Sequence, residues 1–175
     1  MKPTQLLESE YASYYQPYIN ALEENINLIE ELEISLHKTI QFIQDIPMDK
    51  FDYRYAEGKW TIKEIIQHII DAERVFAYRA LRFSRNDKTE LPGFDENAFA
   101  DAVNPIASQR HLKDLLTELT AVRHASITLF KSFTSEDLLK AGIASNNSMS
   151  VRAIGFIIIG HQNHHMKIFK QRYLE

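Results

Sequence analysis

The stretch TIKEIIQHIIDAERVFAYRALRFS, residues 61 to 84, carries the clearest signal for the fold. Its apolar residues recur at spacings of three and four, which is the period of an amphipathic helix. Thr61 and Glu64 match the capping box that opens many helices, because each side chain can accept a hydrogen bond from the other's backbone N–H. The segment therefore predicts a long helix that begins at Thr61 and ends near Ser84.

Three further segments show the same period. The stretch from 25 to 47 predicts one amphipathic helix, which ends before Pro47. A second helix is predicted over roughly 108 to 133. A third begins near Ser150, a good N-cap, and runs to about 173. Residues 85 to 107 break the periodicity and are interpreted as a long connection. No segment shows the strict alternation of a half-buried strand.

These segments predict an all-α protein with a single domain, residues 1 to 175. We expect a four-helix bundle with a long crossover connection between the second and third helices. The first 20 residues are expected to add a short N-terminal helix, which Pro17 separates from the first long helix. Bundles of this kind place metal and ligand sites in the core between facing helices.

Composition excludes several classes of function. The chain has 20 Lys and Arg against 24 Asp and Glu, a net charge of −4, and no basic cluster of the kind that binds nucleic acid. It has no cysteine, hence no disulfide, no thiolate metal site and no cysteine nucleophile. The sequence shows no signal-type apolar segment and no run long enough to span a membrane, so we expect a cytoplasmic protein.

The stretch GHQNHHMK, residues 160 to 167, places three of the chain's seven histidines on the last predicted helix. His161 and His165 lie one turn apart in line with flanking isoleucines, and the pair His161 and His164 fits the apolar face almost as well. A pair at this spacing can chelate one cation, but Gln162 occupies the place of the glutamate in HExxH proteases. Periodicity leaves the choice of pair open.

A third ligand is expected from another helix, because two are too few for a strong site. His68 is the best candidate, since it lies within the apolar face of the helix that begins at Thr61. Three such imidazoles would bind Zn²⁺, Ni²⁺, Fe²⁺ or Mn²⁺. The alternative is that they are core histidines hydrogen-bonded to protein groups. The remaining histidines lie in mixed polar surroundings and are expected to be ordinary surface or packing residues: His37, His111 and His124.

In three stretches the chain resembles the DinB/YfiT-like superfamily of metalloenzymes. They are GKWTIKEIIQHIIDAER at 58 to 74, RALRFSRNDKTELPGFDEN at 79 to 97, and GHQNHHMKIFKQRYL at 160 to 174. The first and last match the metal signature of that family, one histidine on the second helix and a His-x-x-x-His pair on the last. The resemblance thus implies that His68, His161 and His165 bind the metal and that His164 is a neighbour.

The same resemblance implies a divalent metal, zinc or nickel first and manganese or iron as alternatives. It implies an enzyme, either a thiol S-transferase or a hydrolase. Such an enzyme activates a low-molecular-weight thiol cosubstrate or water, which then attacks a small electrophilic substrate. The resemblance also implies a homodimer. Asp95 and Glu96 are the candidate catalytic pair at the mouth of the site. Alternatively, Asp95 or Asn97 caps a short helix that begins at Glu96.

Several neighbours are open to more than one interpretation. Asp71 either supports an imidazole or forms an ion pair with Arg74 or Lys63. Trp60 is expected to pack as a hydrophobic staple rather than as a substrate platform. A fourth ligand could come from His164, Asp71 or the PGFDEN carboxylates, which would favour a structural metal. The competing hypothesis for the whole chain is a non-catalytic binding or assembly module with a structural metal or none.

Overall fold

The computed structural model describes residues 1 to 175, except for the side chain of Asn104. In chain order its regular elements are η1 (Pro3–Gln5), η2 (Glu8–Glu10), η3 (Ser13–Tyr15), α1 (Gln16–Asn20), α2 (Leu28–Gln44), η4 (Met48–Lys50), α3 (Ile62–Ser84), α4 (Glu96–Ala107), α5 (Leu112–Lys131), α6 (Ser135–Leu139), β1 (Ala141–Ala144), β2 (Asn147–Ser150), α7 (Val151–Ile168) and η5 (Phe169–Leu174).

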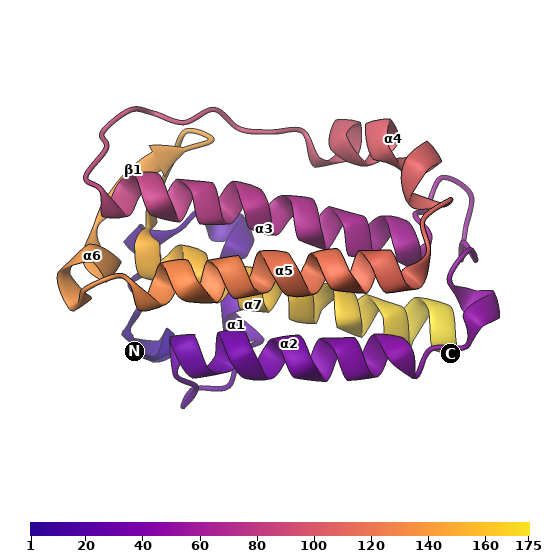
Figure 1. Ribbon diagram of the computed structural model, residues 1–175. Helices are drawn as coiled ribbons and strands as arrows, with labels where there is room; N and C mark the ends of the chain where they lie inside the picture. Colours follow the sequence, from indigo (N-terminus) through magenta and orange to yellow (C-terminus); the bar gives the residue numbers. More distant parts are fainter.

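Four long helices, α2, α3, α5 and α7, form the predicted bundle (Figure 1). Helix α3 packs against both α5 and α7, and α2 packs against the same two helices from the other side. Residues 85 to 111 cross the length of the bundle between α3 and α5, so these two consecutive long helices run in the same direction. The predicted fold class and its crossover are confirmed.

The predicted helix starts at Thr61 and Ser150 are also confirmed. Thr61 accepts a hydrogen bond from the backbone N–H of Glu64 at 3.2 Å, and the Glu64 carboxylate accepts one from Thr61 N–H at 2.7 Å. Ser150 accepts from the N–H of Ala153 at 3.1 Å. These two caps fix where α3 and α7, the helices that carry His68 and the histidine pair, begin.

The connection between α3 and α5 is long, as expected, but not wholly irregular, because it contains the helix α4. Asp95 caps this helix by accepting from the N–H groups of Asn97 and Ala98, both at 3.0 Å, so the alternative of a short helix that begins at Glu96 is confirmed. Strands were not expected, yet β1 and β2 form an antiparallel hairpin. Its turn residues Ser145 and Asn146 have φ of 53° and 61°, the left-handed conformation of a tight two-residue hairpin turn.

The apolar core falls into two clusters, and a polar layer lies between them. One cluster surrounds Phe76 and Phe130, and the other surrounds Ile66 and Leu119. Every long helix contributes buried polar side chains to this layer: Ser35, Thr39, Gln67, His68, Glu73, Arg123, Ser126, His161, Gln162 and His165. Because buried polar groups are costly without partners, this layer is where the search for a site begins.

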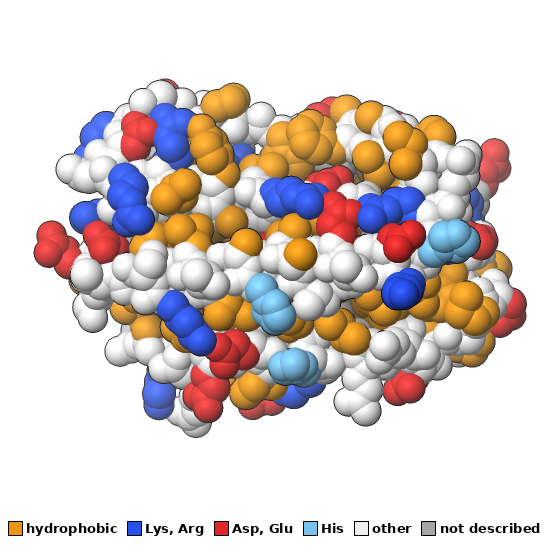
Figure 2. Space-filling model, viewed as in Figure 1, with side chains coloured by type: hydrophobic (Ala, Val, Ile, Leu, Met, Phe, Trp, Pro, Cys, Tyr) orange, Lys and Arg blue, Asp and Glu red, His pale blue; other side chains and the backbone are white. Residues whose placement is uncertain are grey.

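The surface carries mixed charge. On the face that α5 presents, basic and acidic side chains are interspersed with apolar ones (Figure 2). His37, His111 and His124 are exposed, as predicted. Among the helices that the structure describes, none combines the length and the hydropathy that crossing a membrane requires.

Candidate metal centre

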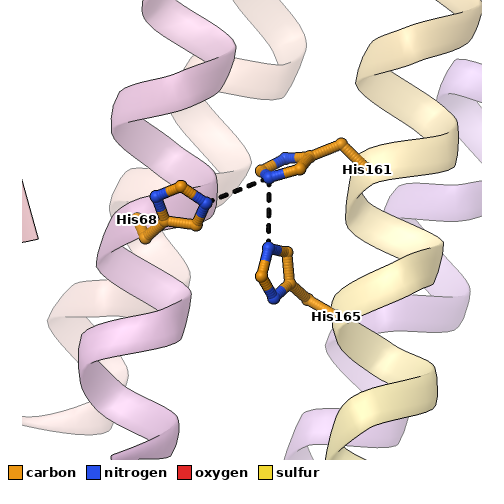
Figure 3. Close-up of side chains that lie close together, drawn as sticks. All are labelled: His68, His161 and His165. Carbon is orange, nitrogen blue, oxygen red and sulfur yellow. Dashed lines mark hydrogen bonds between the residues drawn. The ribbon is translucent and has the colours of Figure 1, made fainter. Parts of the chain in front are cut away.

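Three histidines from two helices converge in the polar layer (Figure 3). The Nε2 atom of His161 lies 3.0 Å from Nε2 of His68 on α3 and 3.1 Å from Nε2 of His165, one turn further along α7. All three side chains are buried, with exposed fractions of 5 to 8%. The structure therefore brings together the three residues that the family resemblance implied.

Hydrogen bonds among the three rings cannot account for this arrangement. A neutral imidazole has one N–H donor and one acceptor lone pair, so Nε2 of His161 can make only one proper bond to its two imidazole neighbours. Burial lowers the pKa of His68 to about 4 and that of His161 to about 3, and it holds the pKa of His165 well below its ordinary value. The rings are therefore neutral near pH 7, with lone pairs available to a cation.

The spacing of the nitrogens fits a shared divalent ion. Two imidazole nitrogens that each bind one zinc ion at about 2.1 Å lie between roughly 3 and 4.2 Å apart. The observed separations of 3.0 and 3.1 Å fall at the short end of that range. An all-imidazole donor set suits zinc, nickel, copper or iron better than magnesium or calcium. The residues present therefore fit a transition-metal ion.

Packing against neighbouring rings holds the side chain of His165, because its Nδ1 nitrogen is buried and makes no hydrogen bond among the described residues. Ring centroids of His68 and His161 lie 5.0 and 4.6 Å from its own, and that of His164 lies 5.3 Å away. His164 itself is exposed and is not part of the group of three.

A close helix contact covers the other side of His161. A Cβ atom on Gly160 would lie 2.5 Å from the carbonyl oxygen of Tyr18, so only glycine lets α1 approach α7 this closely. As a result, the Tyr18 ring packs 5.6 Å from the ring of His161 and 5.2 Å from that of His164, centroid to centroid. The α1 segment is thus a cover for the histidine cluster.

For two of the acidic candidates, Asp95 and Asp71, the structure shows the non-catalytic alternative. Asp95 serves as the cap of α4, which is the alternative to a catalytic role. Desolvation raises the pKa of Glu96, with a further contribution from Asp95, while Arg79 opposes the shift. Asp71 accepts hydrogen bonds from Gln67 at 3.1 Å and from Arg74 at 3.4 Å, so the ion-pair alternative applies to it.

Trp60 packs against the core just before α3, as expected, and it also contacts the histidine cluster. Its ring centroid lies 5.1 Å from that of His68, and it lines a cavity of about 240 Å³ that His165 also lines. The indole therefore separates one ligand candidate from solvent and forms a wall of the space beside another. Its position just before a capped helix was visible in the sequence, but its contact with His68 was not.

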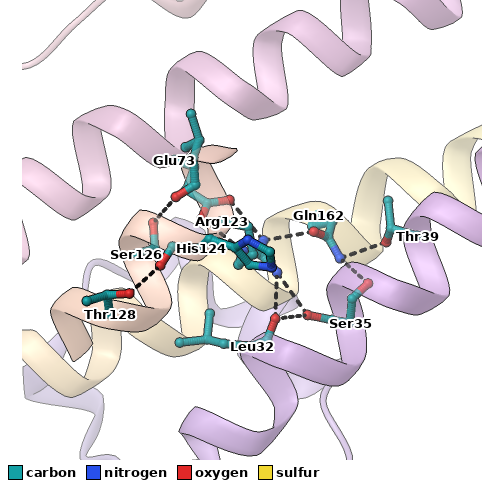
Figure 4. A network of polar contacts seen from close by, with 10 residues as sticks. Leu32, Ser35, Thr39, Glu73, Arg123, His124, Ser126, Thr128 and Gln162 are labelled. Atoms are coloured by element: carbon teal, nitrogen blue, oxygen red, sulfur yellow. Dashed lines mark hydrogen bonds and ion pairs between the residues drawn. The ribbon is translucent and has the colours of Figure 1, made fainter. Parts of the chain in front are cut away.

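A second polar group, beside the histidines, was missed (Figure 4). Arg123 on α5 is fully buried and donates to Glu73 on α3 at 2.8 and 2.9 Å and to Gln162 on α7 at 2.8 Å. Gln162 also donates to the Ser35 carbonyl at 3.1 Å and to Thr39 at 2.7 Å, both on α2. The residue that replaces the protease glutamate therefore joins α7 to α2 and α5 next to His161, and Arg123 extends the network to α3 through Glu73.

Comparisons with known proteins agree with the fold. A curated protein of Oceanobacillus iheyensis, named "putative metal-dependent hydrolase", is 24% identical over 166 residues, which cover 92% of this chain and 82% of that protein. The solved structure of YfiT from Bacillus subtilis superposes with a TM-score of 0.70 at 17% identity, covering 93% of this chain and 91% of the other. That protein is described as a probable metal-dependent hydrolase with an unusual four-helix bundle topology. The model of the DinB superfamily matches residues 31 to 169, which include all three converging histidines, and the chain therefore belongs to the DinB superfamily.

Proposed function

We propose that this protein is a metal-dependent enzyme whose divalent cation is held by His68, His161 and His165. The observation that carries the proposal is the convergence of three buried Nε2 atoms, with 3.0 and 3.1 Å between neighbours. The names of the Oceanobacillus and Bacillus relatives support a metal-dependent activity, and hydrolysis in particular. Zinc and nickel are the first candidates for the metal, because both accept imidazole ligands.

When bound, the cation would supply Lewis acidity that lowers the pKa of a thiol or water so that a nucleophile exists near neutral pH. The chain has no cysteine, so a thiol nucleophile would come from a cosubstrate. The protein's own contribution is a dry site. Tyr18 covers His161 and Trp60 covers His68, which excludes water from two sides of the histidine cluster.

Glu96 is the candidate base for the nucleophile's proton. The cap hydrogen bonds from Asn97 and Ala98 occupy Asp95, whereas Glu96 is exposed and, after the larger effect of burial, its charge helps to raise the pKa of Tyr18. The pKa of Glu96 is itself raised by desolvation. A raised pKa brings a carboxylate closer to the range in which a general base works well at neutral pH.

The metal content of purified protein tests the proposal. Wild type would be purified without chelator or nickel resin and compared with His68→Ala, His161→Ala and His165→Ala by elemental mass spectrometry. We expect about one ion per chain in wild type and loss of that ion in each variant, because two imidazoles are too few for a strong site. His164→Ala is the matched control, since it removes an exposed neighbour on the same helix.

Two results would contradict the proposal. Wild type that binds no metal, even after incubation with zinc, nickel or manganese, would make the cluster a set of core histidines. Retention of the ion in His68→Ala would show that the two residues on α7 bind it without α3. Circular dichroism of each variant establishes that loss of metal does not come from loss of the fold.

A further inference from the structure

A cavity of about 240 Å³ lies beside His165, one of the three ligand candidates. Its lining comes from the loop before α3, from α3 and from the ends of two other helices: Tyr55, Gly58, Lys59, Trp60, Ile65, Asn97, His165, Ile168 and Tyr173. The volume lies below the range of roughly 300 to 1,000 Å³ that holds drug-sized ligands. The occupant is therefore a small molecule.

The walls of this cavity are aromatic. Tyr173 donates a hydrogen bond from its hydroxyl to the carbonyl of Trp60, which holds the C-terminal segment against the loop before α3. The ring of Tyr55 packs edge-on against Tyr173 with centroids 5.2 Å apart. Rings fixed in this way provide a preformed apolar site for a planar group, and aromatic pairs add attraction beyond their buried area.

The residues that line the cavity carry positive charge and no negative charge. Lys59 is the only charged residue among those that line the cavity, and no acidic residue is among them. Arg54, which lies next to Lys59, forms an ion pair with Glu64 at 2.6 Å. Lys59 itself forms no ion pair within the described part of the chain. Lys59 is exposed, so water solvates its ammonium group when no ligand is bound, and an anionic ligand would add a counter-charge that a neutral or cationic ligand lacks.

From these observations we propose that the cavity binds a small aromatic anion of the arylcarboxylate class. The ring lies against Trp60 and Tyr173, the negative group is paired with Lys59, and the rest of the molecule extends toward His165. The proposal rests on the proposed function, because it names the class of substrate that the metal site would act on. It concerns binding alone and requires no particular reaction.

The fluorescence of Trp60 can report binding in the cavity, because Trp60 is the only tryptophan in the chain. Metal-free protein would be titrated with phenylacetate and with its neutral analogue phenylacetamide, while tryptophan emission is recorded at low salt. An exposed ion pair contributes up to about 1 kcal/mol, which is about a fivefold change in affinity. We therefore expect phenylacetate to quench Trp60 saturably and to bind about fivefold more tightly than phenylacetamide.

Variants at Lys59 separate charge from packing. Lys59→Gln should reduce the affinity for phenylacetate to that for phenylacetamide, and Lys59→Arg should preserve the difference. Lys88→Gln removes an equally exposed lysine from the segment that follows α3, at the other end of the bundle, and should behave as wild type. Isothermal titration calorimetry on the same samples detects binding that leaves the emission unchanged.

Equal affinity for the acid and the amide, insensitivity to Lys59→Gln, or no binding by either method would overturn the proposal. These outcomes are distinguishable from failure of the proposed function. The titration uses metal-free protein, so a failed titration together with a metal-loaded wild type rejects only the substrate class. A successful titration with a wild type that never binds metal rejects only the metal-dependent activity.

Discussion

Arg123 on α5 donates two parallel hydrogen bonds to Glu73 on α3, at 2.8 and 2.9 Å, in the centre of the bundle. Their side chains are 0% and 2% exposed. Removing two charges from water is expensive, and here the cost is offset by further bonds from Arg123 to Ser35 at 3.0 Å and to Gln162 at 2.8 Å. Because Gln162 lies within the histidine turn of α7, directly after His161, the same bonds fix how α7 is rotated toward α3.

Removing one member of this pair should be strongly destabilising. Arg123→Met leaves the Glu73 carboxylate buried without its counter-charge, and breaking a buried pair in this way costs about 3–5 kcal/mol. Urea unfolding followed by circular dichroism measures the change. The double variant Arg123→Met/Glu73→Leu should lose less stability than Arg123→Met alone, because no buried charge is left unpaired.

Lys131→Met provides the control for this first prediction. Lys131 lies on the same helix and pairs with Glu33 at 2.5 Å, but these side chains are 54% and 45% exposed. An exposed pair is worth about 0–1 kcal/mol, so this variant should unfold near the wild-type midpoint. A loss in Arg123→Met no larger than that in Lys131→Met would mean that the buried pair does not stabilise the bundle.

Replacing Gly160 should disturb the cover over the histidines. In Gly160→Ala the new Cβ atom would lie 2.5 Å from the backbone oxygen of Tyr18, so α1 has to move. Overpacking costs about 1–3 kcal/mol, and the better helix propensity of alanine returns up to about 1 kcal/mol of it. We expect a net loss of about 1–2 kcal/mol in urea unfolding. A variant as stable as wild type would show that α1 adapts freely.

The long helices could be predicted because each carries its own signal. The capping box at Thr61, the N-cap at Ser150 and apolar spacings of three and four are local properties of the chain. The start of α4 at Glu96 was one of two alternatives, but its extent was not predicted, because Asn104-Pro105 and the turn residues before Glu96 resemble loop sequence and Pro105 nevertheless lies in its last turns. The hairpin was missed because strands of four residues are too short for alternation to be recognised.

The candidate site could be predicted only in part from the residues. Periodicity placed His68 and His161 on apolar faces but could not choose between His164 and His165, since both spacings lie on one helix face. The structure resolves this, because His165 is buried beside His161 while His164 is exposed. The Arg123–Glu73 pair was not predictable, because its members are 50 residues apart and a charged residue on a helix ordinarily faces solvent.

Acid should weaken the attachment of the N-terminal segment to α7. Glu10 accepts hydrogen bonds from Ser150 and from Arg152 Nε, both at 2.7 Å. Burial alone would raise the pKa of Glu10, but these bonds outweigh burial and hold its pKa below the ordinary value. Since the folded pKa lies below the unfolded one, the stabilisation is fully present above about pH 4.5 and is lost as the pH falls through the folded value.

The variant Glu10→Gln isolates this contribution. It should lower the free energy of unfolding by about 1–2 kcal/mol at pH 7, because charge-assisted hydrogen bonds are lost. Between pH 5 and pH 3 its stability should fall less steeply than that of wild type, as measured by urea unfolding at each pH. Parallel curves for the two proteins over that range would assign the acid sensitivity to other carboxylates.

Metal removal should lower thermal stability through the three histidines. An ion that binds only the folded state stabilises it by about 2.7 kcal/mol when its concentration is 100 times the dissociation constant. For a chain of this size each kcal/mol shifts the unfolding midpoint by about 2–4 °C, so chelation should lower Tm by roughly 5–10 °C and added zinc should restore it.

His68→Ala, which removes the one candidate ligand on α3, should unfold at the same temperature with or without zinc. His164→Ala, which changes the exposed neighbour, should keep the full shift. An equal zinc response in His68→Ala and His164→Ala would show that the stabilising ion binds elsewhere on the chain.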